Sequence, residues 1–182
     1  MRPVRLLSVM VAACGMACSK EAPRVEHDAI FGVALTVPAH FVRTDAADAE
    51  QRRQYALDAI GLGIVEPIEV LSVRNGGSGT HARVSVFAFD MPLAETLAGF
   101  RQAYVQAPEL AIVAEELLEL PLAGRSFQGA RYEVSAGTGA NVYQTVLATS
   151  YRPGTIVLSV TTGDPDERLN LEKILHTVSL DP

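Results

Sequence analysis

Cysteine, tryptophan and lysine are scarce in this chain of 182 residues. It contains two cysteines, Cys14 and Cys18, no tryptophan, and only two lysines among its 15 basic residues. Because both cysteines lie near the N-terminus, we expect the remainder of the chain to have no internal disulfide, no thiolate nucleophile and no cysteine-ligated metal. A domain in that remainder would be stabilised by its apolar core.

Positive charge is also in short supply. Fifteen Lys and Arg face 21 Asp and Glu, which gives a formal net charge of −6. Nucleic-acid binding requires clustered basic residues that contact phosphates, so an acidic domain without a basic stripe is not expected to bind nucleic acid. The same deficit argues against attraction to anionic lipid through charge alone.

Motifs for catalysis and metal binding are missing as well. The four histidines are scattered and form no H-E-x-x-H pattern. The loop Gly76-Gly77-Ser78-Gly79 lacks the endings of a phosphate loop and of a nucleophile elbow, and it separates two β-branched runs, which predicts a hairpin turn. We expect no cofactor, no metal and no catalytic residue. The alternative is a small periplasmic hydrolase or ligand-processing enzyme whose site is assembled from loops.

The N-terminus has the form of a secretory signal. Basic residues precede an apolar run at 6–13 that is too short to span a bilayer. Val11-Ala12-Ala13-Cys14 resembles the bacterial lipobox, in which the cysteine is acylated and becomes the mature N-terminus. Cys18, which follows Gly15-Met16-Ala17, is the alternative lipidation site. This divides the chain into a signal peptide at 1–13, a lipid anchor and flexible tether at 14–28, and one domain at 29–182.

The lipobox resemblance implies a cellular location and a partner. Two or three acyl chains, palmitate among them, hold a protein stably on a membrane. Neither Cys14 nor Cys18 is followed by the Asp that often signals inner-membrane retention, so the outer membrane is favoured in a Gram-negative cell. We expect a periplasm-facing protein that binds an envelope protein whose identity the sequence does not define. The alternative is an ordinary cleaved signal that releases a soluble periplasmic protein.

The apolar patterns predict an α+β domain with a mostly antiparallel sheet of about six or seven strands, flanked by helices. The hairpin at 142–162 is expected to turn at Arg152-Pro153-Gly154, with positive φ at Gly154. Asp164 should cap a helix that reaches Val178. Strands are predicted at 31–37, 68–74, 81–89, 114–122, 127–135, 142–151 and 155–162, and helices at 45–60, 91–104 and 167–178.

The sequence contains two further groups of side chains that could form a site. The carboxylates Glu115, Glu116 and Glu119 are expected on the solvated face of an edge strand. Tyr143 and Tyr151 share one strand face, which would suit a carbohydrate or peptide surface if it were exposed. We expect this row to pack in the core.

Several segments resemble the Mog/PsbP-like proteins, including the DcrB and LpqN types. They are the strand ending Leu35-Thr36-Val37-Pro38-Ala39-His40-Phe41, the segment Leu122-Ala123-Gly124-Arg125-Ser126-Phe127, Ala130-Arg131-Tyr132, and the final hairpin with the helix 167–178. The resemblance spans roughly residues 29 to 180. It implies an α/β/α sandwich and an accessory or binding role in membrane-associated assemblies, and it offers no shared catalytic residue.

Overall fold

The computed structural model describes residues 22–44, 68–75, 82–107, 109–137, 139–152 and 154–181. Both cysteines, the predicted helix at 45–60 and the glycine loop at 76–79 lie outside these residues. The described elements are β1 (Arg24–Asp28), β2 (Val33–Val37), β3 (Phe41–Arg43), β4 (Ile68–Asn75), β5 (Arg83–Phe89), α2 (Leu93–Gln106), β6 (Leu110–Leu122), β7 (Arg125–Ala136), β8 (Asn141–Tyr151), β9 (Gly154–Thr162), α3 (Pro165–Leu175) and β10 (Ser179–Leu180).

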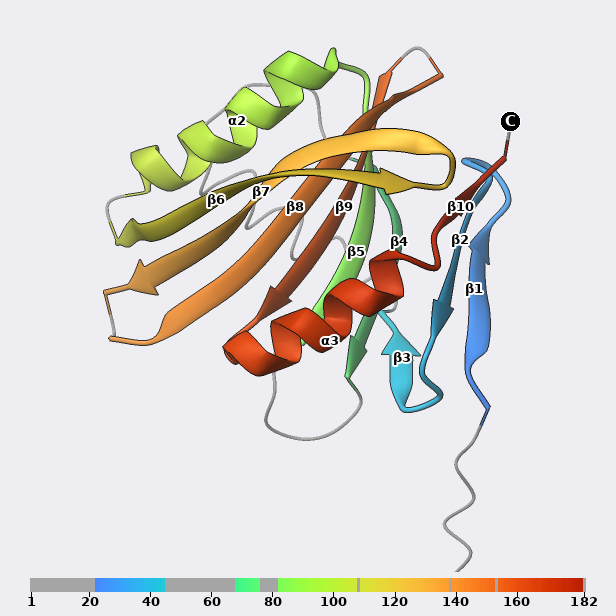
Figure 1. Ribbon diagram of the computed structural model, residues 1–182, viewed down its shortest axis with the longest axis horizontal. Helices are drawn as coiled ribbons and strands as arrows, with labels where there is room; N and C mark the ends of the chain where they lie inside the picture. The colour runs from blue at the N-terminus through green and yellow to red at the C-terminus, as the bar shows by residue number, and fades with distance from the viewer. Residues whose placement is uncertain are drawn as a thin grey trace, which may run out of the picture.

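A seven-stranded sheet forms the centre of the domain (Figure 1). Its order is β3-β4-β5-β9-β8-β7-β6, and every described neighbour pair in it is antiparallel. The predicted hairpin β8–β9 lies in the middle, where β9 pairs with β5 on one side and β8 on the other. The predicted α+β class and antiparallel sheet are therefore confirmed.

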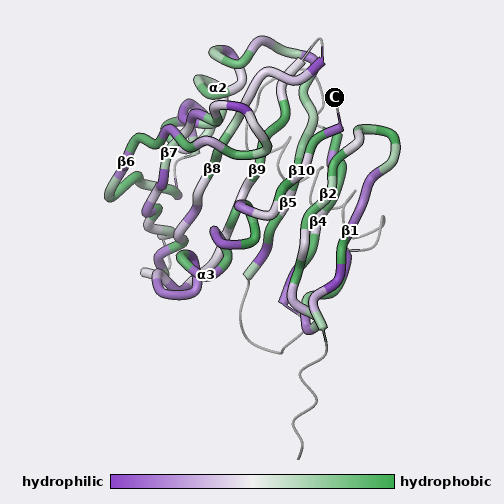
Figure 2. Tube along the Cα trace, turned by 45° about the vertical axis from the view of Figure 1, so that its right-hand side comes forward, coloured by the Kyte–Doolittle hydropathy of each residue, from purple (hydrophilic) through white to green (hydrophobic). Residues whose placement is uncertain are grey.

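The two faces of this sheet carry separate apolar clusters because side chains alternate along each strand. On β8, Val146 and Ala148 face α2, whereas Leu147 and Tyr151 face α3 and β2. Helix α2 covers one face with Leu93, Leu97, Phe100 and Tyr104. Figure 2 shows the middle strands β5 and β9 as largely hydrophobic and α3 as largely hydrophilic, which fits an interior sheet under an amphipathic helix.

A second, three-stranded sheet lies beside α3, in the order β1-β2-β10 (Figure 1). It corrects two predictions. Residues 24–28 were assigned to the flexible tether, but they form β1, which pairs with β2 from Arg24↔Val37 to Asp28↔Val33. The strand at 33–37 belongs to this small sheet and not to the large one. The layer opposite α2 is therefore shared between α3 and three short strands.

The turn between β8 and β9 differs from the prediction. Tyr151 pairs with Gly154, so Gly154 already belongs to the strand, and Arg152 adopts the left-handed backbone with φ 55°. A Cβ at Gly154 would lie 2.1 Å from the carbonyl oxygen of Phe89. Glycine is thus required here by the close approach of β5, and not by a positive φ.

Helix α3 begins as predicted but ends earlier. The Asp164 carboxylate accepts hydrogen bonds from the backbone amides of Asp166 at 2.8 Å and Glu167 at 3.4 Å, and Pro165 opens the helix. The helix ends at Leu175 and not at Val178. Val178 is nevertheless buried with Leu171, Ile174 and Leu175, so the predicted apolar stripe continues beyond the helix end.

Candidate functional site

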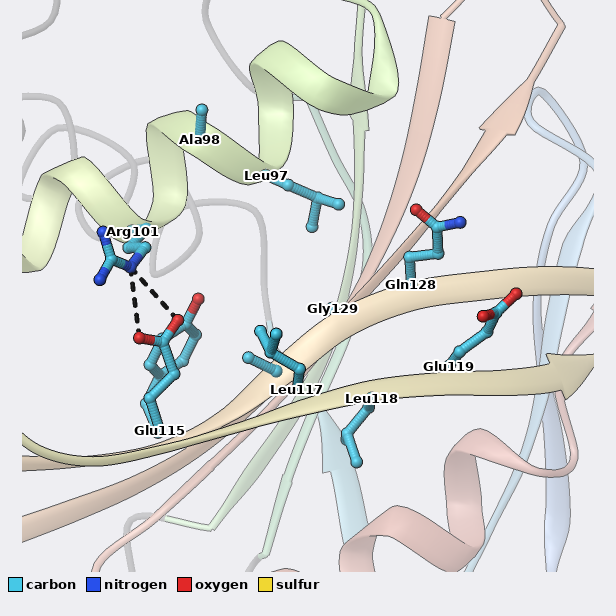
Figure 3. A pocket seen from close by; sticks show the side chains of 11 residues that line it. Leu97, Ala98, Arg101, Glu115, Leu117, Leu118, Glu119, Gln128 and Gly129 are labelled. Carbon is cyan, nitrogen blue, oxygen red and sulfur yellow. Dashed lines mark hydrogen bonds and ion pairs between the residues drawn. The ribbon is translucent and has the colours of Figure 1, made fainter.

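A cleft of about 510 Å³ opens between α2 and the β6–β7 hairpin (Figure 3). Leu97 and Ala98 of α2 line one side, β7 contributes a floor around Gly129, and side chains of β6 form the other side. Leu117 is 81% exposed here. A large, exposed apolar side chain beside a partly apolar cleft marks a candidate binding surface.

An ion pair crosses the cleft from the helix to the strand. The Arg101 Nε–H donates to the two oxygens of Glu115 at 3.3 and 3.2 Å, as the dashed lines in Figure 3 show. Behind it, the rings of Tyr104 and Tyr132 lie 5.2 Å apart between centroids. Burial raises the pKa of both phenols, and the Glu115 charge raises that of Tyr132 further. Both tyrosines therefore remain neutral at physiological pH and do not provide a base.

The end of the cleft nearest the β6–β7 turn has a different polarity. Glu119 accepts a hydrogen bond from the Ser126 hydroxyl at 2.7 Å, and it has no cation partner among the described residues. Gln128 extends from β7 on the same side of the sheet, as Figure 3 shows. The cleft is thus lined by one guanidinium, two carboxylates and one amide around an apolar middle.

The hairpin that forms this cleft is closed by a two-residue turn. Ala123 and Gly124 have φ of 49° and 71° between the paired residues Leu122 and Arg125. Two consecutive positive φ values define a type I′ turn, whose twist matches that of the flanking strands. After this tight turn, β6 and β7 run antiparallel along almost the whole length of β6. β6 is the outermost strand of the sheet.

The opposite face holds a charged network that fastens α3 to the sheet. The Arg131 guanidinium donates to both oxygens of Glu172, at 2.8 and 2.7 Å, and to Glu116 at 3.0 Å. The Thr145 hydroxyl also donates to Glu172. Burial raises the pKa of Glu172, but hydrogen bonds from Arg131 and Thr145 outweigh it and the pKa is lowered overall. Glu172 is therefore ionised and fully engaged, as a structural group is.

If the protein were a hydrolase, three buried serines would be candidate nucleophiles. Ser72, Ser85 and Ser159 are cross-strand neighbours on β4, β5 and β9. The Ser72 and Ser85 hydroxyl oxygens lie 3.1 Å apart, and the Arg83 Nε–H donates to Ser72 at 2.7 Å. An arginine stays protonated and cannot act as a base, so this contact does not activate Ser72.

In the structure, the glutamates of β6 that the sequence offers as a possible site do not come together. Glu115, Glu116 and Glu119 have three different partners, as described above, and they form no paired acid site. Within the described ranges, no group of three or more His, Cys, Asp or Glu side chains is placed to hold a metal ion. Of the tyrosine row, Tyr151 is buried in the core as expected, whereas Tyr143 is half-buried under the guanidinium of Arg168 and belongs to neither apolar cluster.

The cleft itself was not predicted from the sequence. Arg101 and Gln128 have no motif around them, and each reaches the cleft only through long-range packing. The sequence held one signal. In a strand predicted to lie at the edge of the sheet, Leu117 stands two residues from Glu115 and two from Glu119, and so shares a strand face with both. An apolar side chain on the solvated face of an edge strand is unusual enough to indicate a contact surface.

Comparisons with known proteins show which known fold the chain shares. No protein-family model matches the sequence, and no curated protein matches it. The solution structure of cyanobacterial PsbP (CyanoP) from Synechocystis sp. PCC 6803 superposes with a TM-score of 0.58 at 12% identity, covering 94% of this chain and 99% of that chain. LpqN of Mycobacterium tuberculosis, described as involved in cell envelope biogenesis, matches with a TM-score of 0.48 at 14% identity, covering 88% and 91%. The chain has a PsbP-like fold.

Proposed function

We propose that this protein is a lipid-anchored, periplasm-facing module of the bacterial cell envelope that binds another envelope protein without catalysis. The observation that carries the binding role is the open cleft between α2 and the β6–β7 hairpin, with Leu117 exposed at its rim. An accessory role is also what the sequence resemblance to Mog/PsbP-like proteins implies.

The anchoring role is supported by the N-terminal sequence. Cys14 follows a lipobox-like tripeptide, and Arg24, where β1 begins, lies ten residues further along the chain. Even fully extended, ten residues reach at most about 36 Å, so an anchor at Cys14 would hold the domain close to the bilayer. No helix in the ranges that the structure describes has the length and apolar character needed to cross a membrane.

The binding role is supported by the chemistry of the cleft. Its middle is apolar, Arg101 and Glu115 already neutralise each other in an ion pair, and Tyr132 in its lining is held neutral. General acid–base catalysis needs a group whose pKa lies near the operating pH. The groups of this cleft with a shifted pKa are moved away from neutrality, which favours recognition over reaction.

Acylation tests the anchor. Cells that express the full chain are labelled with a palmitate analogue, and the wild type is compared with Cys14→Ser and Cys18→Ser. We expect label in the wild type and in Cys18→Ser, and loss of label together with release from the membrane fraction in Cys14→Ser. Loss only in Cys18→Ser moves the anchor to Cys18, and an unlabelled wild type rejects the lipoprotein assignment.

Site-directed photocrosslinking in intact cells tests the binding role. A photoreactive residue replaces Leu117 at the cleft, and in a second variant it replaces Leu169, which is 50% exposed on α3 at the other face of the sheet. We expect one discrete crosslinked protein with the probe at 117 and no such product with the probe at 169. Equal, diffuse labelling from both positions would argue against a binding site at the cleft.

A further inference from the structure

We propose that the cleft takes an extended segment of a partner protein that adds as a strand to the open edge of β6 and turns both apolar and basic side chains toward the cleft. This inference rests on the proposed function, because it assigns the chemical class of partner to the same cleft. The occupant is defined by three properties of the site, namely its open backbone edge, its apolar rim and its excess of negative charge.

The backbone edge is long and open. β6 has 13 residues and is the last strand of the sheet order, and in the described part of the chain only β7 pairs with it. The strand at the opposite end of the sheet, β3, has three residues. An unpaired edge presents amide and carbonyl groups that another strand can bond. The register of β6 shifts between Ile112 and Ala114, and Pro121 has no amide hydrogen, so a ladder would extend over 114–120.

Apolar side chains stand along this edge. Leu117 is 81% exposed and Val113 is 59% exposed on β6, while Leu97 faces the strand from α2 (Figure 3). Side chains on one face of a strand recur every second residue. Glu115, Leu117 and Glu119 therefore share the cleft face of β6. On that face, one apolar side chain of an added strand could cover Leu117 toward Leu97, which leaves the positions two residues away to lie beside the two carboxylates.

Charge selects the remaining positions of the partner. The cleft is lined by Glu115, Glu119 and Arg101, which leaves one negative charge in excess. Arg101 is engaged by Glu115, whereas among the described residues Glu119 accepts only from the Ser126 hydroxyl. The whole chain carries −6. A basic side chain beside Glu119 would be attracted, and an acidic segment would be repelled.

The same charges disfavour a second copy of this chain as the occupant. Two β6 strands that pair antiparallel about their common centre place Glu116 opposite Glu116, and a shift by two residues places Glu115 opposite Glu119. Like charges directly opposite on neighbouring strands are destabilising. The partner is therefore a different chain of opposite charge.

Peptide binding tests this class of partner. The full chain, purified in detergent, is titrated against a fluorescein-labelled nine-residue peptide whose odd positions alternate between valine and lysine and whose even positions are threonine, and against a matched peptide with glutamate in place of lysine. We expect a rise in anisotropy with the lysine peptide only, weaker at high salt. Leu117→Asp should weaken binding about tenfold or more, since it removes an apolar contact. Glu119→Gln should weaken it about threefold, and Leu169→Asp should leave it unchanged.

Backbone methylation tests the strand addition. On an added strand, alternate amides point toward β6 and the others point away. Two lysine peptides are therefore N-methylated at either the odd or the even positions. We expect one pattern to abolish binding and the other to retain it. If both patterns bind as the parent peptide does, or if both fail, the peptide does not pair with β6 as a strand.

The outcomes separate this inference from the proposed function. Equal binding of both peptides, equal loss in Leu117→Asp and Leu169→Asp, or no binding would overturn the assigned partner class. The binding role would still hold if a discrete crosslink forms at position 117. A dimer that light scattering detects and that Leu117→Asp abolishes would overturn the inference in favour of self-pairing.

Discussion

At the scale of single residues, Glu172 has the most consequential electrostatic environment described. Its pKa is lowered below the ordinary 4.5, because the hydrogen bonds from Arg131 and Thr145 outweigh the effect of burial. A carboxyl whose pKa is lower in the folded state contributes stability that is present above its unfolded pKa. That contribution is lost as the pH falls from about 4.5 through the lower folded value.

Replacement of this carboxylate should therefore produce a pH-dependent defect. We expect Glu172→Gln to lower the free energy of unfolding by about 1–3 kcal/mol at pH 7, the range for hydrogen bonds to charged groups. The difference from the wild type should shrink between pH 5 and pH 3, values that bracket the ordinary pKa. Urea denaturation at several pH values measures both.

Glu116 offers the matched control for this test. It binds the same guanidinium, but its side chain is 62% exposed, so Glu116→Gln should cost less than about 1 kcal/mol. If both variants lose equal stability, or if Glu172→Gln keeps the full acid sensitivity of the wild type, the assigned role of Glu172 is wrong.

At the scale of elements, Gly129 lets the backbones of β7 and β8 approach closely. A Cβ there would lie 1.8 Å from the carbonyl oxygen of Val146, which belongs to the backbone and cannot rotate away. Gly129→Ala should therefore destabilise the domain by about 1–3 kcal/mol or more, because the strands must separate.

The matched control for this substitution lies on α2. Gly99 has nothing within 4 Å of an added Cβ, so Gly99→Ala should stabilise the domain by about 0.5–1 kcal/mol through helix propensity. Thermal unfolding followed by circular dichroism compares the two. A neutral Gly129→Ala would contradict the close packing of β7 on β8.

Elements with strong local patterns could be predicted, and elements without them could not. The hairpin β8–β9, the cap at Asp164 and the presence of strands at β6 and β7 follow from alternation, turn residues and capping chemistry. β1 and β10 were missed because Arg24–Asp28 is polar and Ser179–Leu180 has two residues. Both are strands only because β2 lies between them, and a pairing of that kind is not encoded locally.

At the scale of the whole molecule, Tyr151 connects parts that are far apart in the sequence. From the centre of the large sheet, its hydroxyl lies 2.9 Å from the carbonyl oxygen of Phe31 and 3.0 Å from that of Asp181. The amide of Asp181 in turn donates to the carbonyl of Gly32 at 2.8 Å. The C-terminal segment and the β1–β2 connection are thus fastened to one buried phenol.

Removal of this hydroxyl should loosen the small sheet without unfolding the large one. In Tyr151→Phe we expect hydrogen exchange at the Asp181 amide to become about fivefold faster, which corresponds to ~1 kcal/mol, while exchange in β9 stays nearly unchanged. Tyr143→Phe on the same strand is the matched control and should alter neither. Equal acceleration throughout the domain would show that the two sheets open together.

The sequence by itself determined the α+β class, the antiparallel hairpins, the helix cap at Asp164 and the two apolar faces, because each depends on neighbours within a few residues. Tertiary structure decided that β2 joins a separate sheet, that Gly154 serves a close contact and not a turn, and that α2 and β6 enclose a cleft. These features depend on contacts between distant segments, whose geometry a local pattern of apolar and polar residues does not specify. Leu117 illustrates the division, since its place between glutamates was visible in the sequence but its position beside the cleft required the fold.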